Sequence, residues 1–332
     1  MTGFGAGRLL DSLGWTAFFS EQVERGDAGL IPGRVSNVHR ARLTVVGETG
    51  STDLSLAARV TTADFAVGDW VLADPDSLML RRRLERRTLL QRRPEGKGPP
   101  QLLGANVDTL FLVTSCNADF NPSRLERYLA LANEAGTTPV IVLTKADMAS
   151  DARSFEKQAA ALQSGLAVVV LNAKKPDAAA ALAPWCGSGQ TVALAGSSGV
   201  GKSTLVNTLS GASQQTGGIR EQDGKGRHTT TSRSLHAMAS GGWVIDTPGM
   251  RTLHVSDVDA GIDRLFSDIT DLAPLCKFRD CTHDHEPGCA VQAAVKAGTL
   301  DADRLARWRK LSSENRGNAP AQAPKRPGGR GR

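Results

Sequence analysis

One stretch near the middle of the chain restricts the possible folds more than any other: residues 191–208 read TVALAGSSGVGKSTLVNT. Residues 191–195 form an apolar run typical of a buried strand, and Leu205, Val206 and Leu209 recur at helical spacing. Between them lies the pattern of a P-loop, in the strand–loop–helix setting that this motif requires. We therefore expect an α/β domain built around a phosphate-binding loop.

The residues of this loop predict how it binds a nucleotide. Glycines let successive backbone N–H groups point at phosphate oxygens, and the following helix adds its positive end. Lys202 is expected to reach the outer phosphates and Ser203 to bind Mg²⁺. A glycine-rich turn that matches by chance is the alternative, and the flanking strand and helix weigh against it. The predicted loop residues are Gly196, Ser197, Ser198, Gly199, Val200, Gly201, Lys202, Ser203 and Thr204.

Strands alternating with helices surround the loop in the sequence. Residues 122–135 carry Leu125, Tyr128, Leu129 and Ala132 on one face, as an amphipathic helix does. Alternation of such helices with apolar runs is typical of a largely parallel sheet covered on both faces. The six predicted strands are 107–114, 140–143, 167–171, 191–195, 234–239 and 243–245.

Two short motifs at strand ends predict guanine recognition. Thr144-Lys145-Ala146-Asp147 resembles the Asn-Lys-x-Asp motif of GTPases, in which the Asp accepts two hydrogen bonds from guanine. Adenine lacks that donor pair, and hydrogen bonds to a charged group are strong enough to select the base. Asn172-Ala173-Lys174 resembles the Ser-Ala-Lys element, whose backbone N–H binds the guanine carbonyl. The chain has Thr144 in place of Asn and Asn172 in place of Ser, and we expect Thr144 to loosen the tie between base and P-loop.

The last predicted strand of the sheet leads into Asp246-Thr247-Pro248-Gly249. An Asp in this position holds Mg²⁺, often through water, and Gly249 offers its N–H to the terminal phosphate. The chain thus runs base recognition, P-loop, switch threonines and DTPG, whereas ordinary GTPases begin with the P-loop. We therefore predict a circularly permuted GTPase domain over residues 94–258, which is tolerable because domain termini often lie close together.

The N-terminal part of the chain has a different pattern. Five short runs of alternating polarity between residues 30 and 93 predict a small all-β barrel. An OB-like barrel, whose exposed face commonly binds oligonucleotides, fits them, and an SH3-like barrel is the alternative. Residues 1–29 form an N-terminal extension to which we assign no function, and 92–100 are a linker by composition. The five runs are 34–38, 42–46, 53–60, 69–74 and 78–84.

A cluster of cysteines follows the GTPase motifs. In Cys276-x4-Cys281-x-His283-x5-Cys289, three thiolates and one imidazole match a closed tetrahedral zinc shell, and His285 is a rival ligand. We expect residues 259–315 to be a helical domain whose small core needs this metal. The tail, residues 316–332, is rich in Pro, Gly, Ala and Arg, and we expect it to be disordered.

Charge and hydropathy indicate the partners. The net charge of +6 is concentrated in two clusters: residues 81–93 hold seven arginines against one glutamate, and residues 304–332 hold nine basic residues against Glu314. Such clusters favour a polyanionic partner, with RNA the commonest in the cytoplasm, although solvated surface is the alternative for each. The longest apolar run, 166–171, is too short to cross a membrane. We expect a cytoplasmic monomer.

The permuted order, the preceding barrel, the segment GRHTTT at 226–231 and the cysteine cluster together resemble the ribosome small-subunit-dependent GTPase A family. The resemblance covers about residues 30–312. It implies a GTPase that binds the small ribosomal subunit and its rRNA late in bacterial subunit maturation and is stimulated by it. The family's zinc ligands map onto the four positions named above. A P-loop ATPase and a non-enzymatic RNA-binding scaffold with a nucleotide-sensing site are the competing interpretations.

The residue that activates water is the least obvious part of the sequence. Many GTPases have Gln directly after the DxxG glycine, where this chain has Met250, which cannot orient water. The nearest polar candidate is His228, immediately before the switch threonines. We predict that His228 positions the water when the subunit orders its segment, while Thr230, or else Thr229, binds Mg²⁺. An RNA contact by His228 is the alternative.

Overall fold

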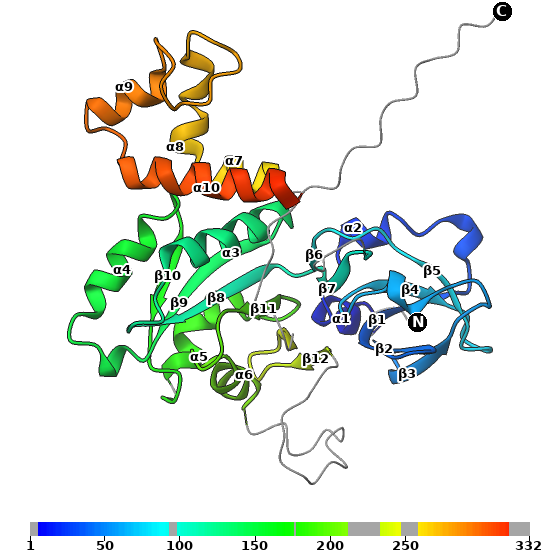
Figure 1. The fold of residues 1–332 in the computed structure, drawn as a ribbon. Coiled ribbons are helices and arrows are strands. Elements are labelled where there is room, and N and C mark those ends of the chain that lie inside the picture. Colours follow the sequence, from blue (N-terminus) through cyan, green and yellow to red (C-terminus); the bar gives the residue numbers. More distant parts are fainter. Residues whose placement is uncertain (1–5, 93–97, 176, 212–232, 247–257, 319–332) are drawn as a thin grey trace, which may run out of the picture.

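A mixed sheet forms the centre of the computed structural model, which describes residues 6–92, 98–175, 177–211, 233–246 and 258–318 (Figure 1). Its GTPase half has the order β10-β9-β8-β11-β13-β12, in which β12 alone runs antiparallel to its neighbour β13. The six predicted strands are confirmed as β8 (Thr109–Ser115), β9 (Thr138–Thr144), β10 (Ala167–Val170), β11 (Thr191–Ala195), β12 (Ser234–Ala237) and β13 (Trp243–Asp246).

Helices cover both faces of this half, as predicted. Successive side chains of a strand point to opposite faces, so β8 places Leu110 and Leu112 in one apolar cluster and Phe111 and Val113 in the other. The first cluster includes side chains of α3 (Pro122–Glu134) and α4 (Ala152–Ala160). The second includes those of α5 (Asp177–Leu182) and α6 (Lys202–Ser210). The P-loop strand β11 is therefore buried on both faces.

The N-terminal strands close into a ring. β1 pairs with β2 and β4, β2 with β3, and β4 with β5, all antiparallel, while a parallel bridge from Ser55 to Met79 joins the end of β3 to the start of β5. Val35, Leu43 and Leu54 lie in its buried core. The strands are β1 (Ile31–Val38), β2 (Arg42–Gly47), β3 (Gly50–Ser55), β4 (Trp70–Ala73) and β5 (Leu80–Arg83).

The ring and the GTPase sheet are continuous, because Asn37 of β1 pairs with Ser234 of β12. Arg34, 1% exposed, lies at this junction and donates to the carbonyl of Leu13 (2.5 Å), the hydroxyl of Thr191 (2.7 Å) and the carbonyl of Asn106 (3.3 Å). Three parts of the chain thus meet at one guanidinium. The extension, with α1 (Ala6–Ser12) and α2 (Ala17–Ser20), packs against both units.

A two-stranded sheet lies between the ring and the GTPase domain. β6 (Leu89–Arg92) pairs antiparallel with β7 (Gln101–Ala105). The sequence pattern did not predict β7, because the glycine- and proline-rich composition of 92–100 concealed that both flanks are strands. Part of the predicted linker, residues 93–97, lies outside the described residues.

The C-terminal helices pack on α3, with α10 lying along it (Figure 1). A Cβ on Gly261 of α7 would lie 2.0 Å from the carbonyl oxygen of Ala130, so the absence of a side chain permits this close approach. The helices are α7 (Asp259–Leu265), α8 (Ser267–Thr270), α9 (Ala290–Lys296) and α10 (Ala302–Asn318), and α10 thus takes in the first residues of the predicted tail. Along the described ranges, no helix is long and apolar enough to cross a membrane.

Candidate active site and metal centre

The predicted phosphate loop connects β11 to α6 at the carboxyl edge of the sheet. Gly196 has φ +145°, and a Cβ there would lie 2.1 Å from the carbonyl oxygen of Val113. Gly201, with φ +102°, precedes the first residue of α6 in a left-handed conformation. These two glycines let the backbone cross the end of β8 and turn into the helix, as the P-loop pattern predicts.

Two cationic side chains contact the first part of this loop. The ammonium of Lys202 donates to the carbonyl oxygens of Gly196, at 2.8 Å, and of Ser197. The guanidinium of Arg124, from the first turn of α3, donates to the hydroxyl of Ser197. Sequence reasoning missed Arg124, because it belongs to no nucleotide-binding motif and lies 73 residues from its partner.

Thr144 connects the base-recognition strand to the phosphate loop. Its side chain is fully buried, and its hydroxyl lies 2.5 Å from the carbonyl oxygen of Val200 and 3.1 Å from that of Thr114. The single hydroxyl proton serves one of these two acceptors at a time. The hydroxyl therefore provides a direct tie to the P-loop, although we expected this substitution to loosen it.

The two base-recognition motifs lie side by side, because Leu143 of β9 pairs with Val170 of β10. Lys145 has φ +56°, and the exposed Asp147 follows in a short 3₁₀ turn. The carbonyl of Ala173 accepts a hydrogen bond from Thr208 of α6 at 2.9 Å.

The side chain of Asn172 closes its own turn by accepting from the N–H of Lys174 at 3.0 Å. The fold thus brings the three nucleotide motifs 144–147, 172–174 and 196–204 to one edge.

The predicted magnesium ligands are described only in part. Ser203 is exposed in the first turn of α6, and Asp246 is exposed at the end of β13, the strand next to β11. Their roles as magnesium ligands stay predictions. The other predicted residues, His228, Thr230 (with its alternative Thr229) and Gly249, lie outside the described residues.

The cysteine cluster forms a compact donor set. The ligand atoms of Cys276, Cys281, His283 and Cys289 all lie within 4.8 Å of one another. His283 Nδ1 is 3.5 Å from the Sγ atoms of Cys276 and Cys289, which are themselves 3.9 Å apart. A tetrahedral ion with bonds of about 2.0–2.3 Å sets its ligands roughly 3.3–3.8 Å apart. The arrangement fits a metal ion.

The surroundings of His283 select it over His285. His283 is 4% exposed, its ring centroid lies 5.4 Å from that of Trp308, and burial lowers its pKa, which favours the neutral imidazole that binds metals. The side-chain amide of Gln292 donates a hydrogen bond to the backbone carbonyl of His283 at 2.7 Å. The side chain of His285 is 87% exposed and faces Asp284 at 3.2 Å. His283, and not His285, therefore belongs to the cluster that could hold a metal ion.

Comparison with known proteins agrees with this geometry. A sequence model of the family described as "RsgA GTPase" matches residues 83–256. The small ribosomal subunit biogenesis GTPase RsgA of Mesorhizobium japonicum is 69% identical over 331 residues, covering 97% of this chain and 96% of that protein. The chain belongs to the RsgA GTPase family. It is a GTP-hydrolysing enzyme.

Other relatives of this RsgA-family chain extend the likeness. Small ribosomal subunit biogenesis GTPase RsgA 2 of Vibrio vulnificus is 48% identical, covering 96% of this chain and 91% of that protein. YjeQ from Thermotoga maritima superposes with a TM-score of 0.66 at 28% identity, covering 87% of this chain and 99% of its own. YloQ, described as a circularly permuted GTPase, superposes with a TM-score of 0.62 at 27% identity. The match covers 90% of this chain and 99% of YloQ. The predicted permutation is confirmed.

Within the described residues, several arginines of the two predicted basic clusters of this RsgA-family chain pair with carboxylates of the protein. In the first cluster, Arg86 forms a buried pair with Asp69, and three further arginines of 81–93 have carboxylate partners. In the second, Arg304 pairs with Asp268, and Arg307 with the buried Glu126. Much of this charge therefore holds elements together and only part of it faces solvent.

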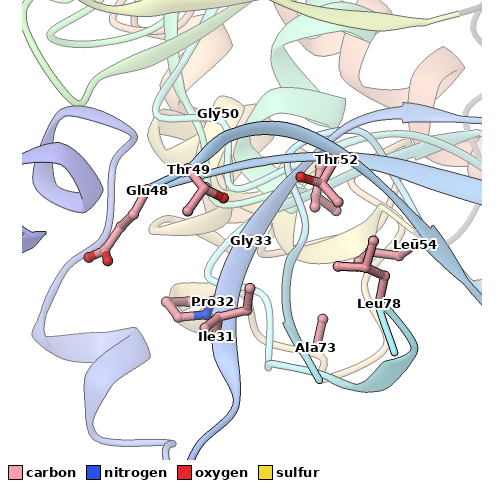
Figure 2. A pocket seen from close by; sticks show the side chains of 12 residues that line it. Ile31, Pro32, Gly33, Glu48, Thr49, Gly50, Thr52, Leu54, Ala73 and Leu78 are labelled. Atoms are coloured by element: carbon pink, nitrogen blue, oxygen red, sulfur yellow. The ribbon is translucent and has the colours of Figure 1, made fainter. Parts of the chain in front are cut away.

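A small pocket opens on the ring of this RsgA-family chain (Figure 2). It has a volume of about 60 Å³ and is lined mainly by apolar groups, among them Ile31, Pro32, Leu54 and Leu78. Glu48 is its one charged lining residue. The pocket is thus mainly apolar and its lining offers no cationic side chain.

Proposed function

We propose that this GTPase hydrolyses GTP to GDP and phosphate while bound to the small ribosomal subunit, late in the maturation of that subunit in the cytoplasm. The 69% identity over nearly the full length to a protein named for small ribosomal subunit biogenesis carries the proposal. The convergence of the phosphate loop with the two base motifs supports GTP over ATP as the substrate. A non-enzymatic scaffold is disfavoured because the chain belongs to a GTPase family.

Guanine selection is assigned to Asp147, with Lys145 along the base and the 172–174 turn at the guanine carbonyl. The carboxylate of Asp147 is exposed at the open edge of the sheet and accepts two hydrogen bonds from guanine in this proposal. The hydroxyl of Thr144 supports the site, because its hydrogen bond to the carbonyl of Val200 links the base-recognition segment 144–147 to the phosphate loop. The loop N–H groups and Lys202 then bind the phosphates.

For hydrolysis, we assign Ser203, Asp246 and Thr230 to the binding of Mg²⁺, which neutralises developing phosphate charge when bound. Gly249 donates its N–H to the terminal phosphate, and His228 accepts a hydrogen bond from the attacking water. These last two assignments, with Thr230, rest on sequence. His228→Ala is expected to lose most subunit-stimulated turnover while GTP affinity and subunit binding stay near the parental values. A parallel loss of subunit binding favours an RNA contact instead.

We assign one structural Zn²⁺ to the four side chains Cys276, Cys281, His283 and Cys289. Three sulfur ligands and one imidazole are a donor set that zinc prefers, and a closed shell without an open position is typical of structural sites. The ion would join the loop 276–289 to the first turn of α9, where Cys289 is the N-cap. Metal removal is therefore expected to loosen this loop and leave the GTPase sheet folded.

The ring of β1–β5 is assigned as an OB-like barrel that binds rRNA. Its five strands and the one parallel contact between β3 and β5 support the OB type over an SH3-like barrel. The domain boundaries proposed are those of the sequence: 30–93, 94–258 and 259–315. Arg83, Arg59 and Arg40 are exposed on the ring or its loops and are the RNA-binding candidates there. We propose that the protein acts as a monomer.

The test is GTP turnover with and without purified small subunits, at two salt concentrations. Stimulation that falls as salt rises is expected, because phosphate contacts release counterions. Lys202→Ala, which removes the phosphate-binding ammonium, should eliminate turnover with and without subunits. Turnover that small subunits do not change would overturn the ribosomal role, and turnover of ATP at the rate of GTP would overturn the base assignment.

A further inference from the structure

Arg124 stands out among the charged side chains near the phosphate loop. Its guanidinium donates to the hydroxyl of Ser197, and it has no carboxylate partner within the described part of the chain. Arg127, one turn further along the same helix, pairs instead with Glu314 at 2.6 Å. Within the described residues, the charge of this half-buried guanidinium is therefore not offset by a paired carboxylate.

Helix α3 holds Arg124 rigidly in this place. Asn121 caps the helix by accepting from the N–H of Arg124 at 2.9 Å, and Pro122 starts its first turn. The C-terminal helices brace α3 further along through Arg127 with Glu314 and through Arg307 with Glu126 at 2.8 Å. A side chain that acts from a packed helix is positioned more accurately than one on a loop.

Ser197 is held at two points, its main-chain carbonyl and its side-chain hydroxyl. Its carbonyl accepts from Lys202, and its hydroxyl accepts from Arg124. The lysine of a P-loop serves the outer phosphates. With nucleotide bound, the three protons of the Lys202 ammonium are shared between the loop carbonyls and the phosphates, whereas the Arg124 contact with the Ser197 hydroxyl does not depend on that lysine.

We propose that Arg124 is a positioning residue for the nucleotide, which acts through Ser197 to hold the phosphate loop in its binding shape. The proposal rests on nucleotide binding at this loop, and it is independent of the ribosomal role. It extends the site to a fourth segment, the first turn of α3. The guanidinium also adds positive charge close to the loop, which favours the anionic ligand.

The test measures the Kd of fluorescently labelled GDP and intrinsic GTP turnover, both without ribosomal subunits. Arg124→Met and Ser197→Ala should each raise Kd roughly tenfold, the effect expected for losing one hydrogen bond with a charged partner. The double variant should be no weaker than Arg124→Met alone, because both changes remove the same contact. Arg124→Lys should recover part of the affinity.

The unfolding temperature without nucleotide separates positioning from a structural role. It should stay near the parental value in Arg124→Met, while the added stability conferred by GDP shrinks. Arg153→Met, an exposed arginine on α4, is the matched control and should change neither quantity.

Parental Kd in Arg124→Met would overturn the proposal. So would effects of the two single variants that multiply in the double variant, because Arg124 would then act independently of Ser197. Since no subunit is present in these assays, failure of the ribosomal role leaves the result unaffected.

Discussion

Thr144→Val removes one hydroxyl from the centre of the nucleotide site and keeps the shape of the side chain. The hydroxyl is fully buried and lies 2.5 Å from the carbonyl oxygen of Val200. Leaving a buried acceptor without its donor costs about 1–3 kcal/mol. For a domain of this size, about 2 kcal/mol corresponds to a fall in unfolding temperature of roughly 4–8 °C.

The same change should weaken nucleotide binding, because Val200 belongs to the loop that binds the phosphates. If the nucleotide must supply about 1.4 kcal/mol to re-form the loop, the Kd of GDP rises about tenfold. Calorimetry and fluorescence titration measure the two effects. Thr144→Ser, which keeps the hydroxyl, should restore most of the affinity.

The control is Thr138→Val, the same substitution at an exposed position at the start of β9, and it should change neither quantity. A Thr144→Val variant that melts and binds GDP like the parent would refute the idea that this hydroxyl ties the base side to the loop.

Three further outcomes are expected. Asp147→Asn should shift preference from guanine towards xanthine nucleotides in competition binding, and an unchanged GTP affinity would remove Asp147 from the base site. Elemental analysis of chelator-free protein should find one zinc per chain, and Cys289→Ser should abolish it; stoichiometric zinc in that variant would exclude Cys289 as a ligand. Hydrogen bonds from Arg82 lower the pKa of Asp27 from 3.8 to about 2, so this carboxylate stabilises the fold above pH 3.8 and loses its effect as pH falls through about 2. Asp27→Asn should therefore melt below the parent at pH 6, with a difference that shrinks between pH 3.8 and 2; a constant difference would refute this.

The sequence predicted those parts of the site that depend on local pattern. The phosphate loop, the base motifs and the cysteine cluster each occupy a few consecutive turns, so spacing alone places their residues in chain order. The runs of apolar residues also predicted the strands, since β8, β9 and β11 are buried on both faces and β10 is apolar throughout.

Contacts between distant segments were beyond such reasoning. No local signal connects Arg124 with Ser197, because the contact exists only after α3 packs beside the loop. The arginines of 81–93 likewise suggested a surface for RNA, yet the partner of Arg86 is a buried carboxylate 17 residues away. Charge content is visible in a sequence, whereas its pairing depends on the fold.

The buried Arg34 has a consequence for how the chain folds during synthesis. Its acceptors include Thr191, which is made 157 residues after it. At about 5–20 residues per second, Arg34 emerges roughly 8–30 s before this partner exists. Until then the guanidinium lacks one of its acceptors and keeps contact with water. The core of the ring consists of ring residues alone, but its contact with the GTPase sheet at Arg34 is completed only when the P-loop strand arrives. Docking of the N-terminal unit therefore waits for the strand that carries the nucleotide loop.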